Sequence, residues 1–334
     1  MSRIHTSAFA LLFSCALSAQ VSDIINAEPA ELKTLAKRTL VVELPEPNQN
    51  VIDDFSKKTA ASDEAAYRAS LESYRQAIEP AVKALWKFNE EIEFKTTTEI
   101  VKLFAAKDKK YVALLKVVLP DGMGEPGCYT FGMGVPALVL TRTDGDSKVS
   151  KKGELRLRKH DFQSYLVLGP SEDGTETYTE ASMKLTLDLC QKYLDWNIKG
   201  KKSQTFMKYL KDEKERNCGL LASKQLMMNK DGLYKKTTEA EISEEYGKKV
   251  EFVDRKGLEA AYLSGASDKA VLVSIPVGTI SGSMIVVTVT KLVYTKIAVD
   301  PSTGQVLSAV VPGMGKSYVE GILPMDAREL AKCK

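Results

Sequence analysis

The sequence predicts an α/β fold, or an α+β fold, built from two similar units that arose by internal duplication. Residues 91–114 and residues 249–273 each contain a short apolar run, an amphipathic helical stretch and a longer apolar run. The two blocks align with a one-residue gap. Because a repeated block indicates a repeated structural unit, we expect two mixed sheets, each with helices packed on it.

The start of the chain has the features of a secretory signal peptide. Arg3 and His5 make it weakly basic, and residues 8–17 form an apolar run that is too short to span a bilayer. Small residues end this run, so cleavage is expected close to Ala19 and the signal is assigned to residues 1–19. No later segment has the apolar length of a membrane helix, so no transmembrane segment is expected after signal removal.

These features predict an exported protein that is periplasmic or associated with the outer membrane. A lipoprotein signal is the alternative, in which Leu12, Phe13 and Ser14 lead to a lipid-modified Cys15. The whole chain has 47 basic and 44 acidic residues, and loss of Arg3 with the signal leaves 46 − 44, or +2. This near-neutral charge gives no electrostatic reason to expect nucleic acid as a partner.

Four cysteines lie beyond the signal: Cys128, Cys190, Cys218 and Cys333. No pair has CxxC spacing, which argues against zinc and thioredoxin-like sites. An exported chain can oxidise its thiols, so at least two of the four are expected to form a disulfide. Free buried thiols are the alternative.

The first unit is assigned to residues 20–176. Thr39–Leu44 reads as a strand that ends at Pro45, and a helix is expected from about Ser62. Pro80 interrupts the apolar stripe of this helix and should kink it or divide it in two. The first repeat block follows, and then further strands are expected at Val112–Leu119, Ala137–Leu140, Leu155 with Leu157, and Tyr165–Leu168.

Two linking helices are expected in residues 177–216, at Tyr178–Ile198 and Gln204–Arg216. The second unit, residues 217–334, is expected to open at Gly219–Ala222, with a short helix between Thr238 and Tyr246. After the second repeat block, strands are expected at Ile285–Val289, Leu292–Val299 and Val306–Val311, the last two joined by a turn at Asp300–Gly304. Each unit therefore reads strand, helix, strand, helix, strand, strand, strand.

This element order, together with the motif Ile92-Glu93-Phe94 and the run Tyr111–Leu115, resembles uncharacterised exported proteins of Bacteroidota-type bacteria. No activity is known for that family, so this resemblance implies no activity for the present chain. By element order alone, the unit is also similar to the α/β domain of curli-secretion lipoproteins and of lipoprotein activators of peptidoglycan synthases. This second resemblance implies a binding or assembly role in the cell envelope, with an envelope protein or a glycan as partner.

Three glycine-containing motifs are better explained as loops than as binding sites. Gly122–Gly127 spells GxGxxG, but Pro126 prevents the helix that a dinucleotide site needs, and the matching segment Gly278–Gly282 is expected to be a short connection. Gly315–Ser317 ends like a phosphate-binding loop without its first glycine. The motif Gly-Met-Gly occurs around Met123, Met133 and Met314. If these methionines lay close together, their thioethers would be suited to bind copper.

Candidate sites are few, and no cofactor or metal ligand set is assigned. His160 is the only histidine after signal removal, so a serine or cysteine triad would have to use it. A basic run offers a possible anion-binding patch, with a solvated face as the alternative: Lys148, Lys151, Lys152, Arg156, Arg158 and Lys159.

Three hypotheses about function follow. The first is a non-catalytic exported envelope protein that binds or scaffolds a partner. The second is a periplasmic hydrolase that uses carboxylates or a serine, for which a pocket holding two acids would be the sign. The third is a soft-metal binder that uses the Gly-Met-Gly loops.

Overall fold

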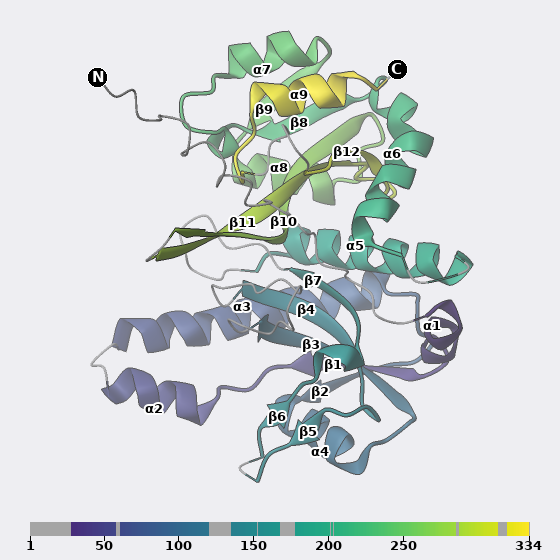
Figure 1. Ribbon diagram of the computed structural model, residues 1–334, viewed down its shortest axis with the longest axis vertical. Coiled ribbons are helices and arrows are strands. Elements are labelled where there is room, and N and C mark those ends of the chain that lie inside the picture. Colours follow the sequence, from purple (N-terminus) through teal and green to yellow (C-terminus); the bar gives the residue numbers. More distant parts are fainter. Residues whose placement is uncertain are drawn as a thin grey trace, which may run out of the picture.

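The computed structural model describes residues 28–57, 61–119, 135–151, 153–167, 178–200, 202, 204–284, 287–312 and 319–333. These residues form two five-stranded mixed sheets with packed helices, which confirms the predicted fold class (Figure 1). Among the residues described, no helix combines the length and the apolar character needed to cross a membrane.

The first unit is built on a sheet of order β2-β1-β3-β4-β7. β1 is parallel to β2 and β3, whereas β3 with β4 and β4 with β7 are antiparallel. Its elements are α1 (Pro29–Leu35), β1 (Thr39–Leu44), α2 (Gln49–Lys57), α3 (Ala61–Leu85), β2 (Ile92–Thr96), α4 (Thr97–Ala106), β3 (Tyr111–Leu119), β4 (Val135–Arg142), β5 (Lys148–Val149), β6 (Leu155–Arg156), η1 (Lys159–Asp161), β7 (Phe162–Val167) and α5 (Glu180–Lys199).

The second unit has the same topology, with the sheet order β9-β8-β10-β11-β12. β8 is parallel to β9 and β10, and the remaining two pairs are antiparallel. Its elements are α6 (Phe206–Leu221), β8 (Gln225–Asn229), η2 (Lys230–Gly232), α7 (Glu239–Tyr246), β9 (Val250–Val253), α8 (Arg255–Leu263), β10 (Lys269–Met284), β11 (Val287–Val299), β12 (Val306–Val310) and α9 (Pro324–Ala331). The predicted order of strands and helices is therefore found in both units.

The structure confirms the duplication, but it aligns the two blocks without the one-residue gap. Leu40 pairs with Ile92 and Val112, and its counterpart Leu226 pairs with Val250 and Ala270. Val112 thus corresponds to Ala270, not to Val271. The sequence alignment was one residue wrong here because the first residues of the two strands, Tyr111 and Lys269, differ in polarity.

Helix caps explain where the repeated helices begin. The Thr96 hydroxyl accepts a hydrogen bond from the N–H of Glu99, whose carboxylate in turn accepts one from the N–H of Thr96. Asp254 caps α8 in the same place by accepting from the N–H of Gly257 at 2.7 Å. Both caps satisfy backbone donors that would otherwise have no partner in the first helical turn.

Three expectations about elements need correction. α3 continues through Pro80 as one helix, so its division in two was wrong. Gly219–Ala222 does not open the second unit: α6 extends to Leu221, and the first strand is β8. Gly278–Gly282 is not a connection but part of β10, where each residue pairs with β11. Among the described strands, this stretch of β10 pairs with β11 alone.

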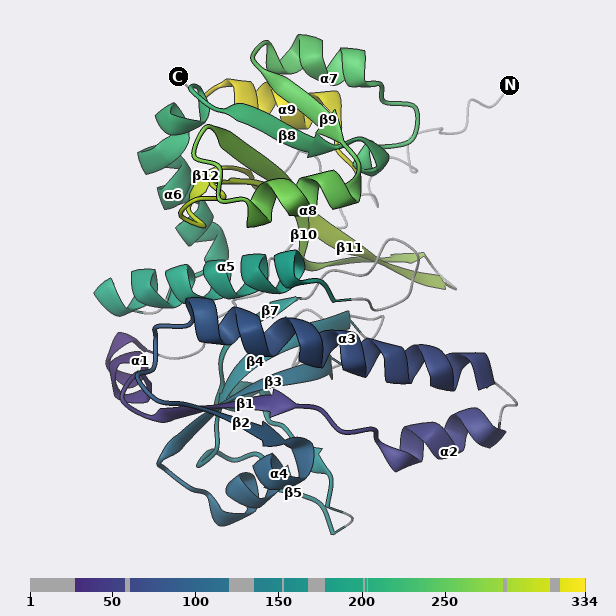
Figure 2. The ribbon, with the colours of Figure 1, turned by 180° about the vertical axis from the view of Figure 1, so that it is seen from behind.

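The two units stack head to tail in layers (Figures 1 and 2). α4 covers the outer face of the first sheet through Ile100 and Phe104, while α3 and α5 cover its inner face. In the second unit α8, the counterpart of α4, lies on the inner face, and α7 and α9 lie on the outer face. The α3–α5 layer of one unit therefore contacts the α8 face of the other.

One hydrophobic core joins the units. It contains buried residues of α3 and α5, of both sheets, and of α8, among them Tyr74, Leu187, Tyr262 and Ile297. A polar contact reinforces it, since the Tyr262 hydroxyl donates to Asp188 at 2.7 Å and Lys184 pairs with the same carboxylate. The predicted turn at Asp300–Gly304 packs here too. Gly304 has φ +64°, and a side chain on it would meet Asp188 at 2.7 Å.

Candidate functional site

The predicted anion patch lies on the small β5–β6 hairpin. Lys148 and Arg156 are a cross-strand pair, and both are exposed, as are Lys151 and Arg158. Lys152 lies outside the described residues, and so does the side chain of Lys159. The structure thus gathers four of the six basic residues on one exposed hairpin, which leaves both the anion-binding and the solvated interpretation open.

His160 is exposed and contacts carboxylates. Its Nε2 lies 3.0 Å from Asp146 Oδ2 and 3.8 Å from Asp161 Oδ1. The buried Asp161 also accepts hydrogen bonds from the N–H groups of Asp146 and Ser147 and from the Ser147 hydroxyl. Asp161 therefore holds a tight turn, and within the part of the chain that the structure describes His160 has no serine or cysteine partner.

One predicted disulfide is present. Cys218 near the end of α6 is bonded to Cys333 after α9, with their Cα atoms 4.9 Å apart. Cys190 is not in a disulfide: it is buried in α5, and burial raises the pKa of its thiol to about 11. Cys128 lies outside the described residues. The expectation that at least two cysteines pair is confirmed.

The glycine motifs fall on parts of the chain that are not described: Gly122–Gly127, Gly315–Ser317 and the residues around Met123, Met133 and Met314. Across the described ranges, no group of three or more histidine, cysteine or acidic side chains is arranged to hold a metal ion.

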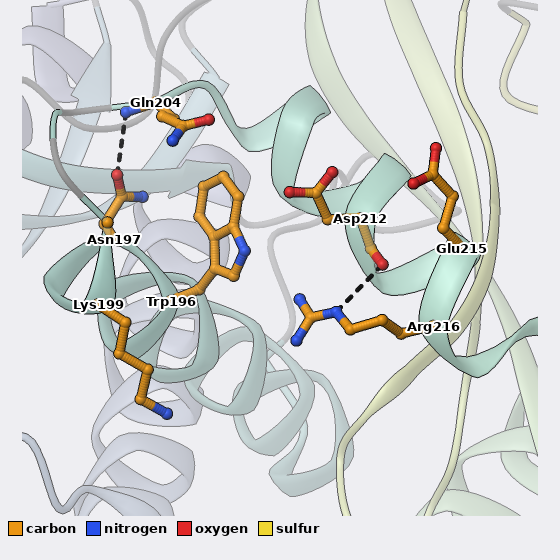
Figure 3. Close-up of a pocket in the computed structure, with 8 residues that line it drawn as sticks. Trp196, Asn197, Lys199, Gln204, Asp212, Glu215 and Arg216 are labelled. Atoms are coloured by element: carbon orange, nitrogen blue, oxygen red, sulfur yellow. Dashed lines mark hydrogen bonds between the residues drawn. The ribbon is translucent and has the colours of Figure 1, made fainter.

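A pocket of about 400 Å³ opens where α5 ends and α6 begins (Figure 3). From their sequence, these helices were expected only to link the two units. Trp196, Asn197 and Lys199 come from α5, and Asp212, Glu215 and Arg216 come from α6. Gly200 and Gln204 in the connection complete the lining.

Trp196 is held on buried aromatic rings. Its ring stacks on Tyr193 with centroids 6.2 Å apart and an interplanar angle of 26°, and it meets Tyr209 edge-on at 5.7 Å. Phe206 packs against both tyrosines. Because Tyr193 and Tyr209 are almost completely buried, they fix the position of the half-buried indole in the pocket wall.

Hydrogen bonds fix several polar groups around the indole. Asn197 Oδ1 accepts from the N–H of Gln204 at 3.0 Å, which ties the end of α5 to the connection (Figure 3). Arg216 donates through Nε to the Asp212 carbonyl at 3.3 Å and through Nη2 to Glu213. Asp212 forms an ion pair with Lys208 one turn earlier.

A second polar cluster lies where β1 and β3 diverge. Their backbone pairing ends at Val42 and Leu114, and beyond it the Glu43 carboxylate accepts from the N–H of Lys116 at 3.1 Å and from the Thr97 hydroxyl at 2.8 Å. Burial raises the pKa of Glu43, and Tyr74 on α3 also has a raised pKa because of burial and the nearby Glu43 charge. In open α/β sheets, ligands bind at the carboxyl ends of strands at such a divergence.

The Lys116 side chain lies on the opposite side of β3 from the Glu43 carboxylate. Its Nζ is 4.7 Å from the centroid of the Tyr178 ring and 5.8 Å from that of Tyr74. It also lies 3.4 Å from the Ser70 hydroxyl. This lysine therefore contributes to packing between β3 and the helical layer.

The second unit has a lysine in the corresponding cross-strand pair. Lys116 pairs with Leu138 in the first sheet, and the equivalent pair in the second sheet is Ser274 with Lys296. Lys296 is completely buried, and its Nζ lies 3.7 Å from Asp326 in α9. Burial lowers the pKa of Lys296. Each unit thus has one lysine in the equivalent cross-strand pair, but on different strands.

Sequence reasoning missed the pocket and both buried clusters. The signal that the sequence did carry is that Trp196 is one of only two tryptophans and lies four residues before Gly200, near the expected end of a helix. Glu43 gave no comparable signal, because its burial depends on the divergence of two strands. Comparisons with protein families, with curated proteins and with solved structures found no match to this chain.

Proposed function

We propose that this chain is an exported, non-catalytic protein of the cell envelope that binds a protein partner through the β10–β11 hairpin. The signal-like start supports export, and the disulfide fits an oxidising compartment. The observation that carries the proposal is the length of the hairpin strands, 16 and 13 residues, compared with 4 or 5 in the other strands of the same sheet.

The hairpin extends well beyond the sheet. β8 pairs with β10 only at residues 269–271, and β12 pairs with β11 only at residues 296–299. Residues 278–284 and 287–292 pair with each other but with no third strand that the structure describes. Figures 1 and 2 show the hairpin projecting from the same side as α2 and the first half of α3.

The composition of the projecting strands favours strand addition. Natural proteins protect exposed strand edges with charges or proline, yet residues 278–284 and 287–292 contain Lys291 as their single charge and no proline. Backbone N–H and C=O groups along such an edge pair readily with an extended segment of another protein. The partner is therefore expected to contribute an extended, largely uncharged segment.

The experiment compares the mature protein with Thr288→Lys/Thr290→Lys as bait in envelope extracts. Charges on an edge strand oppose strand addition, so a partner captured by the wild-type protein should be lost from this variant. Ser223→Lys, exposed after α6, is the matched control and should capture the same partner. N-terminal sequencing of the exported protein tests cleavage near Ala19 in parallel.

Two results would contradict the proposal. If the double variant retains every protein that the control captures, the hairpin is not the binding surface. If the wild-type protein forms a dimer that the double variant does not, the occupant of the edge is a second copy of this chain.

A further inference from the structure

We infer that the pocket between α5 and α6 binds a neutral saccharide. This site is separate from the β10–β11 hairpin, and the inference does not depend on the proposed protein partner. It rests on the three features of the pocket that follow.

The first feature is a rigid aromatic wall. Trp196 stacks on the buried Tyr193 and packs in a T-shaped contact with Tyr209, so binding would not have to order the indole first. The electron-rich face of an indole attracts the C–H bonds on the apolar face of a pyranose ring. Stacking of this kind needs no charge on the ligand.

The second feature is the balance of charge in the lining. Lys199 and Arg216 supply two cations, and Asp212 and Glu215 supply two anions, so their formal charges cancel. A site for phosphate or carboxylate would carry excess positive charge, and a site for an ammonium group would carry excess negative charge. A pocket of zero formal charge favours a neutral polar ligand.

The third feature is the kind and position of the polar groups. The lining combines the Gln204 amide, carboxylates, a guanidinium and an ammonium, which together donate and accept hydrogen bonds as the hydroxyls of a sugar require. The Asn197 amide is buried and already hydrogen-bonded within the protein. In Figure 3, Asn197 and Gln204 lie on one side of Trp196 and Asp212 and Arg216 on the other, with Glu215 farther from the indole. The volume of about 400 Å³ lies within the usual range for small-molecule sites and is suited to one or two sugar rings.

Calorimetric titration of the mature protein with cellobiose, maltose and N,N′-diacetylchitobiose tests the inference. At least one disaccharide should bind saturably, and Trp196→Ala should weaken that binding by about tenfold, as expected for loss of a central aromatic contact. Arg216→Ala, which leaves the aromatic cluster intact, should weaken binding by several-fold. Lys211→Ala, an exposed residue of α6 outside the pocket, should bind like the wild type.

Fluorescence gives a second readout, because the chain has only two tryptophans and Trp86 is buried and bonded to Asn89. A saccharide in the pocket should change the emission of Trp86→Phe, in which Trp196 is the only reporter. Absence of saturable heat with all three disaccharides, or unchanged affinity in both Trp196→Ala and Arg216→Ala, would overturn the inference. Thr288→Lys/Thr290→Lys should bind saccharide normally, so failure here is distinguishable from failure of the protein-partner proposal.

Discussion

At the scale of single residues, each unit contains buried charged side chains. In the first unit the Glu43 carboxylate, in place of a backbone carbonyl of β1, accepts a hydrogen bond from the N–H of Lys116 in β3. The side chain of Lys116 lies against the aromatic rings of Tyr74 and Tyr178. In the second unit Lys296 and Asp326 are both completely buried. Removing two ions from water costs several kcal/mol per ion, so these groups depend on each other and on nearby hydrogen bonds.

Replacing Lys296 with methionine tests this dependence. Lys296→Met leaves the Asp326 carboxylate buried without its cation and should lower the free energy of unfolding by about 3–5 kcal/mol. Lys296→Met/Asp326→Asn should recover part of that loss, because the amide oxygen can still accept from the N–H of Leu323. Urea denaturation of the wild type, both single variants and the double variant gives the coupling energy, and strictly additive losses would contradict an interaction between the two residues.

The sequence predicted best those elements whose apolar pattern is local. β2, α4 and β3, like β9, α8 and β10, alternate between strand and helix periodicity, and capping residues mark the helix starts. β8 was missed because its sequence, Gln225–Asn229, follows a helix that already ends in two leucines. Leu221 is buried and Leu220 is half exposed, because neighbouring residues of a helix point in different directions. This difference in exposure is seen only when the helix is packed in the structure. The α5–α6 pocket escaped prediction for a similar reason, since it depends on how two helices meet.

The disulfide connects elements at the two ends of the second unit, α6 and the segment after α9, across 115 residues. Closing so long a loop restricts the unfolded chain, so Cys218→Ser/Cys333→Ser should lower the free energy of unfolding by about 2–5 kcal/mol. Urea denaturation with and without reductant measures the effect. Reductant should destabilise the wild type and leave the double variant unchanged, whereas an equal response of both proteins would show that the bond does not stabilise the fold.

At the scale of the whole molecule, the shared core makes the two units thermodynamically dependent. Leu187 of α5 is completely buried in the hydrophobic cluster that includes residues of both sheets. Leu187→Ala should lower the free energy of unfolding by about 2–5 kcal/mol while unfolding remains a single transition. Leu220→Ala, which changes a half-exposed leucine, is the matched control and should have little effect. Thermal unfolding followed by circular dichroism and by tryptophan fluorescence should give coincident curves, and two separate transitions would show that the units unfold independently.

The head-to-tail order of the units has a consequence for assembly. A contact between two different faces can repeat from copy to copy, whereas a contact between two identical faces closes after two copies. Within the molecule, the α3–α5 layer of the first unit packs on α8 of the second. By the same geometry, the α7–α9 face of another copy matches the α4 face of this one. In the first unit, Val149, Leu155 and Leu157 from the β5–β6 region pack against the α4 cluster. In the second unit the corresponding link between strands is only the short turn at Asp300–Gly304, which leaves α8 free to contact α5. The insertion between β4 and β7 thus adds structure beside α4, so the outer face of the first unit differs in shape from the α8 face that joins the two units.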